Sequence, residues 1–135
     1  SSAASDVYKR QIHNCADMPH LETQIKKFGV DVYSLAYYPL ADASPNMTKV
    51  IEDGYADNCT IFGNIDPQMF MRSTAEQITK VTADLCQEAK TALCKRGLNS
   101  HMCISSGCEV PPDLECKIEN VTAVMDAVHK YGVME

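Results

Sequence analysis

Short apolar runs alternate along the chain with segments whose apolar residues recur every three or four positions. The runs at 30–38, 59–62 and 102–105 predict three strands, and residues 12–15 read as the end of a further strand. The helical spacing predicts helices over 21–28 and 46–55, a long helix from the 73–76 stretch to Gly97, and a last helix before Gly132. Such alternation with short connections is typical of parallel β/α units with right-handed crossovers.

Each expected helix carries an apolar stripe. Ser73 and Glu76 lie three residues apart and are expected to form a capping box at the start of the long helix. The stripes, in chain order, are Leu21, Ile25 and Phe28; Met47, Val50 and Ile51; Ile78, Val81, Leu85, Ala89, Ala92 and Leu93; and Ile118, Val121, Met125 and Val128.

The order of elements predicts an α/β fold with four parallel strands. A complete (β/α)8 barrel takes about 250 residues or more, so 135 residues correspond to about half of one. A small doubly wound sheet has the same alternation. The spacing alone leaves both architectures open.

Candidate chemistry gathers at two expected strand ends. His13 and Cys15 are two residues apart, and on a strand they project from the same face. Cys108 lies in the loop Ser105–Pro112, where Gly107 eases a turn and two prolines stiffen the exit. One imidazole and two thiolates with a fourth position open are the pattern of a catalytic zinc.

Three motifs in this order give the chain a resemblance to a known family. They are His13-Asn14-Cys15, Gly63-Asn64-Ile65-Asp66-Pro67 and Ser106-Gly107-Cys108-Glu109-Val110-Pro111-Pro112, followed by Glu119-Asn120-Val121 and Tyr131-Gly132. The His-x-Cys pair alone is a weak signal, and the Gly-Cys-Glu-Val-Pro-Pro loop makes it strong. From Ile12 to about Gly132 the chain resembles the zinc-dependent, corrinoid-linked methyltransferase branch of the uroporphyrinogen decarboxylase superfamily.

The resemblance implies a fold, a reaction and a ligand set. The fold would be the C-terminal half of a (β/α)8 TIM barrel. The reaction would be transfer of a methyl group from a methylated corrinoid, carried by a partner protein, to a small thiol substrate. His13, Cys15 and Cys108 would be the zinc ligands, and the substrate thiol the nucleophile.

Three further residues are candidates with two interpretations each. Glu109 is expected either to act in catalysis beside the metal or to favour the positive end of the last helix. Asn64 and Asp66 are expected to contact substrate or cofactor, or to serve as turn residues. Related sites often recruit a carboxylate after the next strand, but residues 35–39 contain no acid and Asp42 is the nearest. Water or the substrate thiol is then the expected fourth ligand.

Charge and composition narrow the classes of partner. A net charge of −6 and a pI near 5.1 argue against nucleic-acid and anionic-membrane surfaces, which require basic patches. No apolar run approaches the ~18 residues of a membrane span, so a cytoplasmic location is expected. The seven cysteines are odd in number and two fall within one helical pattern, which favours reduced thiols over a secreted disulfide framework.

The first eleven residues are expected to be foreign to the fold. Residues 6–11 resemble the translation of a sequencing adapter, which would make 1–11 non-native and 12–135 the family segment. The expected result is a fragment of a longer parent enzyme, inactive by itself.

Two other functions remain open. The first is uroporphyrinogen decarboxylase of porphyrin and heme biosynthesis, whose comparable loop resembles Gly-His-Gly and which uses no metal. The second is a fragment that binds zinc without turnover. Bound zinc separates the first alternative from the methyltransferase.

Overall fold

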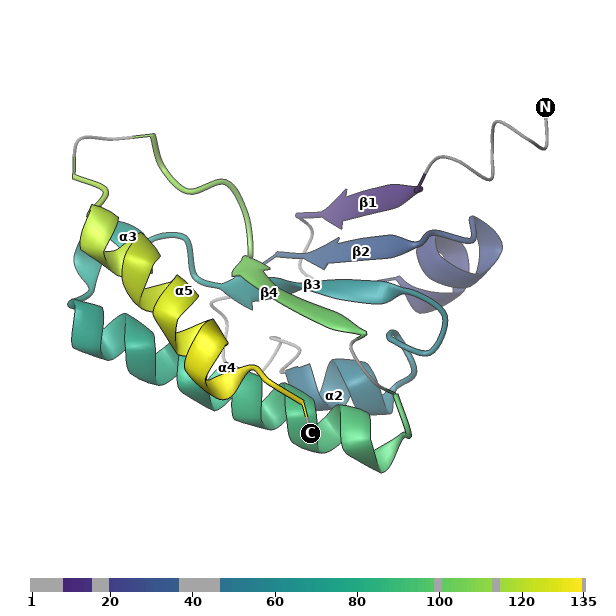
Figure 1. Ribbon diagram of the computed structural model, residues 1–135. Coiled ribbons are helices and arrows are strands. Elements are labelled where there is room, and N and C mark those ends of the chain that lie inside the picture. Colours follow the sequence, from purple (N-terminus) through teal and green to yellow (C-terminus); the bar gives the residue numbers. More distant parts are fainter. Residues whose placement is uncertain (1–8, 16–19, 37–46, 99–100, 113–114, 135) are drawn as a thin grey trace.

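The computed structural model describes residues 9–15, 20–36, 47–98, 101–112 and 115–134. Four parallel strands form one sheet in the order β1-β2-β3-β4, with their arrowheads at the same end in Figure 1. The strands are β1 (Gln11–Asn14), β2 (Val32–Leu35), β3 (Thr60–Ile65) and β4 (Met102–Ser106). The α/β fold with parallel strands is therefore confirmed.

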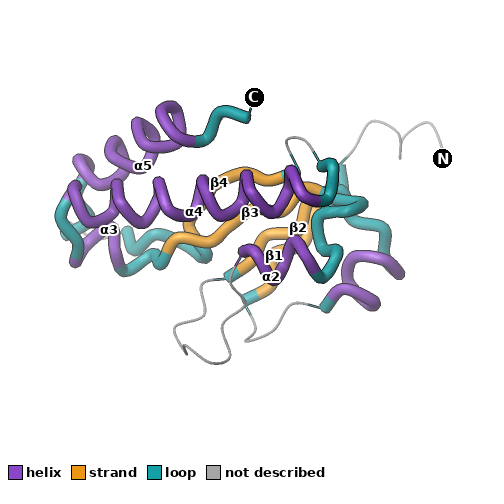
Figure 2. The backbone as a smooth tube through the Cα atoms, turned by 90° about the horizontal axis from the view of Figure 1, so that it is seen from below, coloured by secondary structure: helices purple, strands orange, loops and turns teal. Residues whose placement is uncertain are grey.

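The helices connect the strands and cover one face of the sheet. They are η1 (Leu21–Lys27, a π-helix), α2 (Met47–Glu52), α3 (Met69–Arg72), α4 (Ala75–Lys95) and α5 (Ile118–Tyr131). Seen from below, α2 and α4 lie across the strands, and α5 packs along α4 (Figure 2). The hydrophobic core fills the space between the sheet and these helices.

The two central strands, β2 and β3, bury alternate residues, as expected when only one face of a sheet is covered. In β3 the buried positions are Ile61, Gly63 and Ile65, while Phe62 and Asn64 are half-buried. In β2, Tyr33 and Leu35 are fully buried. We call the side packed on the helices the covered face and the other side the open face.

β3 is longer than the sequence pattern predicts. Residues 63–65 were expected to be part of a closing loop, but they continue the strand. Asn64 pairs with Ser105 and Ile65 with Ser106, so ladder hydrogen bonds to β4 keep this segment extended. Gln11, expected to belong to the foreign segment, opens β1, and the Arg10 carbonyl accepts hydrogen bonds from the Asp31 and Val32 amides.

The capping box of α4 lies one residue later than predicted. The Gln77 amide donates to Thr74 Oγ1, and the Thr74 amide donates to Gln77 Oε1. Ser73 is buried and is the C-cap of α3. Its amide donates to the carbonyl of Met69, the first residue of that helix. Because Ser73 belongs to the end of α3, the next hydroxyl caps α4.

The apolar stripe of α5 is mostly exposed. Ile118 is 79% exposed, Met125 57% and Val121 38%. The residues of α5 that are buried instead are Asn120 and Ala127. Small side chains let α5 approach α4 closely, and the apolar stripe consequently faces outward. By contrast, the stripe of α4 is buried except for Val81, and the three stripe residues of α2 are all buried.

Two further expectations can be compared with the structure. Phe28, predicted in the stripe of the first helix, is 59% exposed, and only Ile25 of η1 is fully buried. All seven cysteines lie in the described residues and none forms a disulfide. No helix in the described part of the chain is long and apolar enough to cross a membrane.

Candidate metal centre

The structure brings His13, Cys15 and Cys108 together at the ends of β1 and β4. We call these three residues the donor cluster. Cys15 Sγ lies 2.7 Å from His13 Nε2 and 3.7 Å from Cys108 Sγ, and all three ligand atoms lie within 4.8 Å of one another. Among the described residues, no other group of three His, Cys, Asp or Glu side chains converges in this way.

Curvature of the sheet explains how the two outer strands share a site. β1 and β4 are separated by two strands, so in a flat sheet they would lie about 14 Å apart. Cys108 cannot reach back through a long loop, because the Gly107 amide still donates to the Ile65 carbonyl at 2.7 Å. Side chains on the inner face of a curved sheet converge, and the donor cluster lies where this curvature draws them together.

The Cys108 loop is held from both sides. Ser106 Oγ donates to the Cys108 carbonyl at 2.7 Å, and the Gly107 amide continues the pairing of β4 with β3. Cys108 and Cys15 are both exposed residues. The loop therefore fixes the backbone beside the cluster and leaves the thiol accessible.

The donor set fits a tetrahedral zinc ion with modest adjustment. Zn–S bonds of about 2.3 Å imply a separation of roughly 3.8 Å between two tetrahedral sulfur ligands. The observed Sγ–Sγ distance of 3.7 Å matches this value. The 2.7 Å between Cys15 Sγ and His13 Nε2 is shorter than the ~3.6 Å that a tetrahedral sulfur–nitrogen pair requires, so these side chains must rotate apart slightly.

Two neighbours of the cluster were not found from the sequence. Asn14, between the two ligands of β1, is buried on the covered face, where its Nδ2 donates to Tyr33 Oη at 2.7 Å and to Gln24 Oε1 at 3.2 Å. His13 Nδ1 lies 2.9 Å from Ser34 Oγ on β2. Tertiary structure decides these contacts, because the partners are 10 to 21 positions apart along the chain. Only the strand period hints that Ser34 faces the cluster.

In the metal-free cluster the neutral form of the Cys15 thiol is favoured. Loss of hydration raises the pKa of Cys15 above its usual value, and the adjacent Cys108 sulfur raises it further through hydrogen bonding and charge repulsion. Two thiolates this close repel each other unless a cation lies between them. A divalent metal would remove this repulsion, which is the electrostatic reason that such a donor set suits one.

The other predicted site residues lie outside the cluster. Asp66 is a turn residue, since its Oδ1 accepts from the Gln68 amide at 2.9 Å and its carbonyl from the Met69 amide at 3.0 Å. Asn64 is half-buried in β3. Glu109 is exposed beside Cys108 and precedes the first turn of α5, whose acidic residue is Glu119, and both interpretations of Glu109 stay predictions. Asp42 lies outside the described residues.

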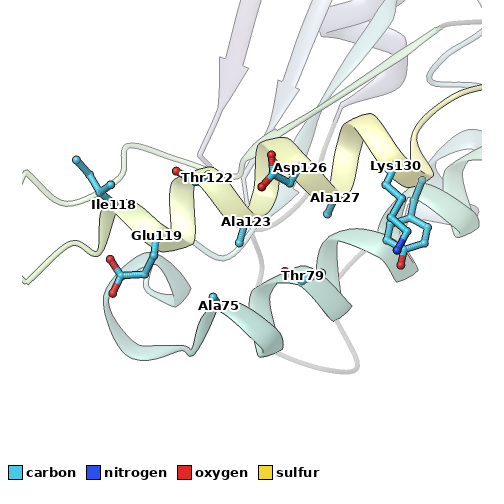
Figure 3. A pocket seen from close by; sticks show the side chains of 10 residues that line it. Ala75, Thr79, Ile118, Glu119, Thr122, Ala123, Asp126, Ala127 and Lys130 are labelled. Atoms are coloured by element: carbon cyan, nitrogen blue, oxygen red, sulfur yellow. The ribbon is translucent and has the colours of Figure 1, made fainter.

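One groove of the described residues lies away from the donor cluster. This groove of about 540 Å³ runs between α4 and α5, with Ala75 and Thr79 on one side and Ala123 and Ala127 on the other (Figure 3). It lies in the outer helix layer, and none of the predicted site residues lines it.

Comparison with known proteins places the chain. The sequence model of the family "Uroporphyrinogen decarboxylase (URO-D)" matches residues 3–131. The chain belongs to the URO-D family. URO-D proteins are TIM-barrel enzymes, which agrees with the four parallel strands that alternate with helices.

Two curated relatives are similar to this URO-D chain. They are proteins named uroporphyrinogen decarboxylase from Tropheryma whipplei strains Twist and TW08/27, and each is 31% identical over 119 residues. The alignment covers 87% of the chain and 26% of each relative. The chain thus spans about a quarter of the length of these relatives. In a barrel of this family the open face is the interior, and the donor cluster lies at the C-terminal ends of the strands.

Proposed function

We propose that this chain carries the metal site of a zinc-dependent methyltransferase that moves a methyl group from a methylated corrinoid to a thiol. The observation that carries the proposal is the convergence of His13 Nε2, Cys15 Sγ and Cys108 Sγ within 4.8 Å. Three protein ligands leave one tetrahedral position open, as catalytic zinc sites do. Cys15 and Cys108 are exposed residues, which leaves room for a substrate at that position.

The chain's own residues would hold the metal and orient the acceptor. His13 and Cys15 supply ligands from the rigid end of β1, and Cys108 supplies a third from a loop tied to β3 and β4. Zinc bound there would keep a substrate thiol ionised near neutral pH. The overall reaction forms one S–C bond and breaks one Co–C bond, whose electron pair stays on the cobalt. The proposed partners are a corrinoid protein that donates the methyl group and a small thiol that accepts it.

Uroporphyrinogen decarboxylase is the second candidate, and the name of the two relatives favours it. Their identity to the chain is 31% over 26% of their length, which leaves most of each relative without a counterpart here. The decarboxylases that the chain resembles use no metal. A cluster of two thiols and an imidazole would have no role in their reaction. The donor cluster is the reason that we place methyl transfer first.

One set of assays on a longer protein that contains this chain separates the candidates. Elemental analysis is expected to find one zinc per chain, and methylcobalamin is expected to lose its methyl group to a small thiol only when zinc is present. Demethylation is followed by the absorption spectrum of cobalamin. Decarboxylation of uroporphyrinogen by a metal-free preparation would instead support the second candidate. Bound zinc with neither reaction would indicate a non-catalytic zinc site.

A further inference from the structure

Ser34 is the residue outside the donor cluster that contacts it most directly. It lies in β2 directly opposite His13 in the parallel ladder, and it is half-buried between the buried residues Tyr33 and Leu35. Its hydroxyl oxygen lies 2.9 Å from His13 Nδ1, a normal hydrogen-bond distance. The strand backbone holds both partners, so the contact does not depend on a flexible loop.

We propose that Ser34 is a positioning residue that accepts a hydrogen bond from His13 Nδ1–H and thereby presents Nε2 to the metal. A neutral imidazole carries its proton on one nitrogen, and the partner of that nitrogen determines which one remains free as a ligand. Zinc-binding histidines generally donate their second N–H to a fixed acceptor. In this chain the nitrogen turned toward Cys15 is Nε2, and the nitrogen turned toward Ser34 is Nδ1.

The geometry of β2 supports a positioning role over simple packing. Two consecutive residues of β2 contact the end of β1 on opposite faces of the sheet. Tyr33 contacts Asn14 on the covered face, and Ser34 contacts His13 on the open face. Asn14 and Tyr33 are buried, so the backbone between His13 and Cys15 is fixed. The remaining freedom of His13 is rotation of its ring. The Ser34 hydroxyl removes this freedom, and no apolar side chain of the same size would.

This inference rests on the proposed metal site, and a matched pair of variants tests it separately. Ser34→Thr keeps the hydroxyl, and Ser34→Val replaces it with a methyl group of similar volume and similar preference for strands. Ser34→Ala provides a third variant if the branched residues unfold the chain. Ser105→Ala is the control, because Ser105 is a half-buried serine at the end of β4 whose hydroxyl donates to the Ser106 carbonyl.

Two measurements on the 135-residue chain are needed. The zinc dissociation constant is measured by competition with a chromophoric chelator, and the ring tautomer of His13 by two-bond 1H–15N correlation in the metal-free chain. Ser34→Val and Ser34→Ala are expected to weaken zinc binding by roughly 10- to 100-fold and to shift the ring toward the Nε2–H tautomer. Ser34→Thr and Ser105→Ala are expected to stay within about threefold of the wild type, with the Nδ1–H tautomer retained.

The outcomes separate the inference from the proposal beneath it. If the wild-type chain binds no zinc through His13, the metal site itself fails. If the wild type binds zinc and Ser34→Val matches Ser34→Thr in both affinity and tautomer, the metal site stands and the role of Ser34 is overturned.

Discussion

The two faces of the sheet differ in what their residues do. Residues on the covered face form the core, and the residues that alternate with them on the open face adjoin the donor cluster. On the covered face, Tyr33, Ile61 and Ile65 are almost completely buried against the helices. On the open face, Ser34 and its ladder partner Phe62 are half-buried, and the exposed donor cluster lies beside Ser34. Because neighbouring residues point in opposite directions, a substitution that weakens the core can leave the donors untouched, and the reverse also holds. Residues that adjoin in sequence but lie on opposite faces are therefore expected to differ in their effects on stability and on zinc binding.

The largest effect is expected from neighbours in β3. Ile61→Ala removes a fully buried side chain from the covered face and is expected to lower the free energy of unfolding by about 2 to 5 kcal/mol. Phe62→Ala, on the half-buried open face, is expected to cost clearly less even though more atoms are removed. Urea denaturation followed by circular dichroism measures both. Equal losses would show that the two faces do not differ in packing.

The donor cluster should respond in the opposite way. Cys108→Ser is expected to weaken zinc binding by at least ~100-fold, since loss of a ligand exceeds the ~10- to 100-fold typical of an outer partner. The free energy of unfolding of the metal-free chain should stay within about 0.5 kcal/mol, because Cys108 is exposed.

Cys103→Ser is the matched control for Cys108→Ser. Cys103 is also exposed and lies near the start of β4, outside the donor cluster. Chelator competition should give it the affinity of the wild type. Equal zinc affinity in both variants would contradict ligation by Cys108.

The strands and the ligand pair were predictable because their signals are local. His13 and Cys15 share a face through the strand period alone, and apolar runs mark three of the four strands. The incorrect predictions concern element boundaries that depend on segments distant in the sequence. β3 continues to Ile65 because β4 pairs with it, and Thr74 caps α4 because Ser73 is the C-cap of α3. Sequence spacing likewise contains no information on which serine of β2 or β4 lies opposite His13.

Asn120 tests how strongly the covered side depends on a polar contact. It is fully buried in α5, and its Nδ2 donates to the carbonyls of Met69, Phe70 and Ser73, which lie in α3 or just after it. Asn120→Ala is expected to destabilise the chain by about 2 kcal/mol, because buried carbonyls lose their donor. The exposed neighbour Glu119→Ala should change stability by less than about 0.5 kcal/mol. Thermal denaturation of both variants checks the difference, and a loss shared by both would indicate a helix effect.

The smallest effect concerns Cys59, a thiol of the covered side that contrasts with the exposed thiols of the cluster. Burial, and then the charge of Asp31, raise its pKa from 9.0 to about 11, and its Sγ donates to the Tyr55 carbonyl at 3.1 Å. The folded state therefore favours the neutral thiol. Because the pKa is raised on folding, this stabilisation is complete below pH ~9 and is lost as pH rises toward ~11.

The expected loss between pH 8 and pH 10 is about 1 kcal/mol of unfolding free energy. Lysines and tyrosines titrate in the same range, so the quantity to measure is the difference between wild type and Cys59→Ala at each pH. Urea denaturation in the metal-free chain is expected to show the wild-type advantage shrinking as pH rises. An advantage that stays constant with pH would mean that Cys59 titrates as an exposed thiol does, and the separation of buried and accessible thiols between the two faces would then be wrong at this position.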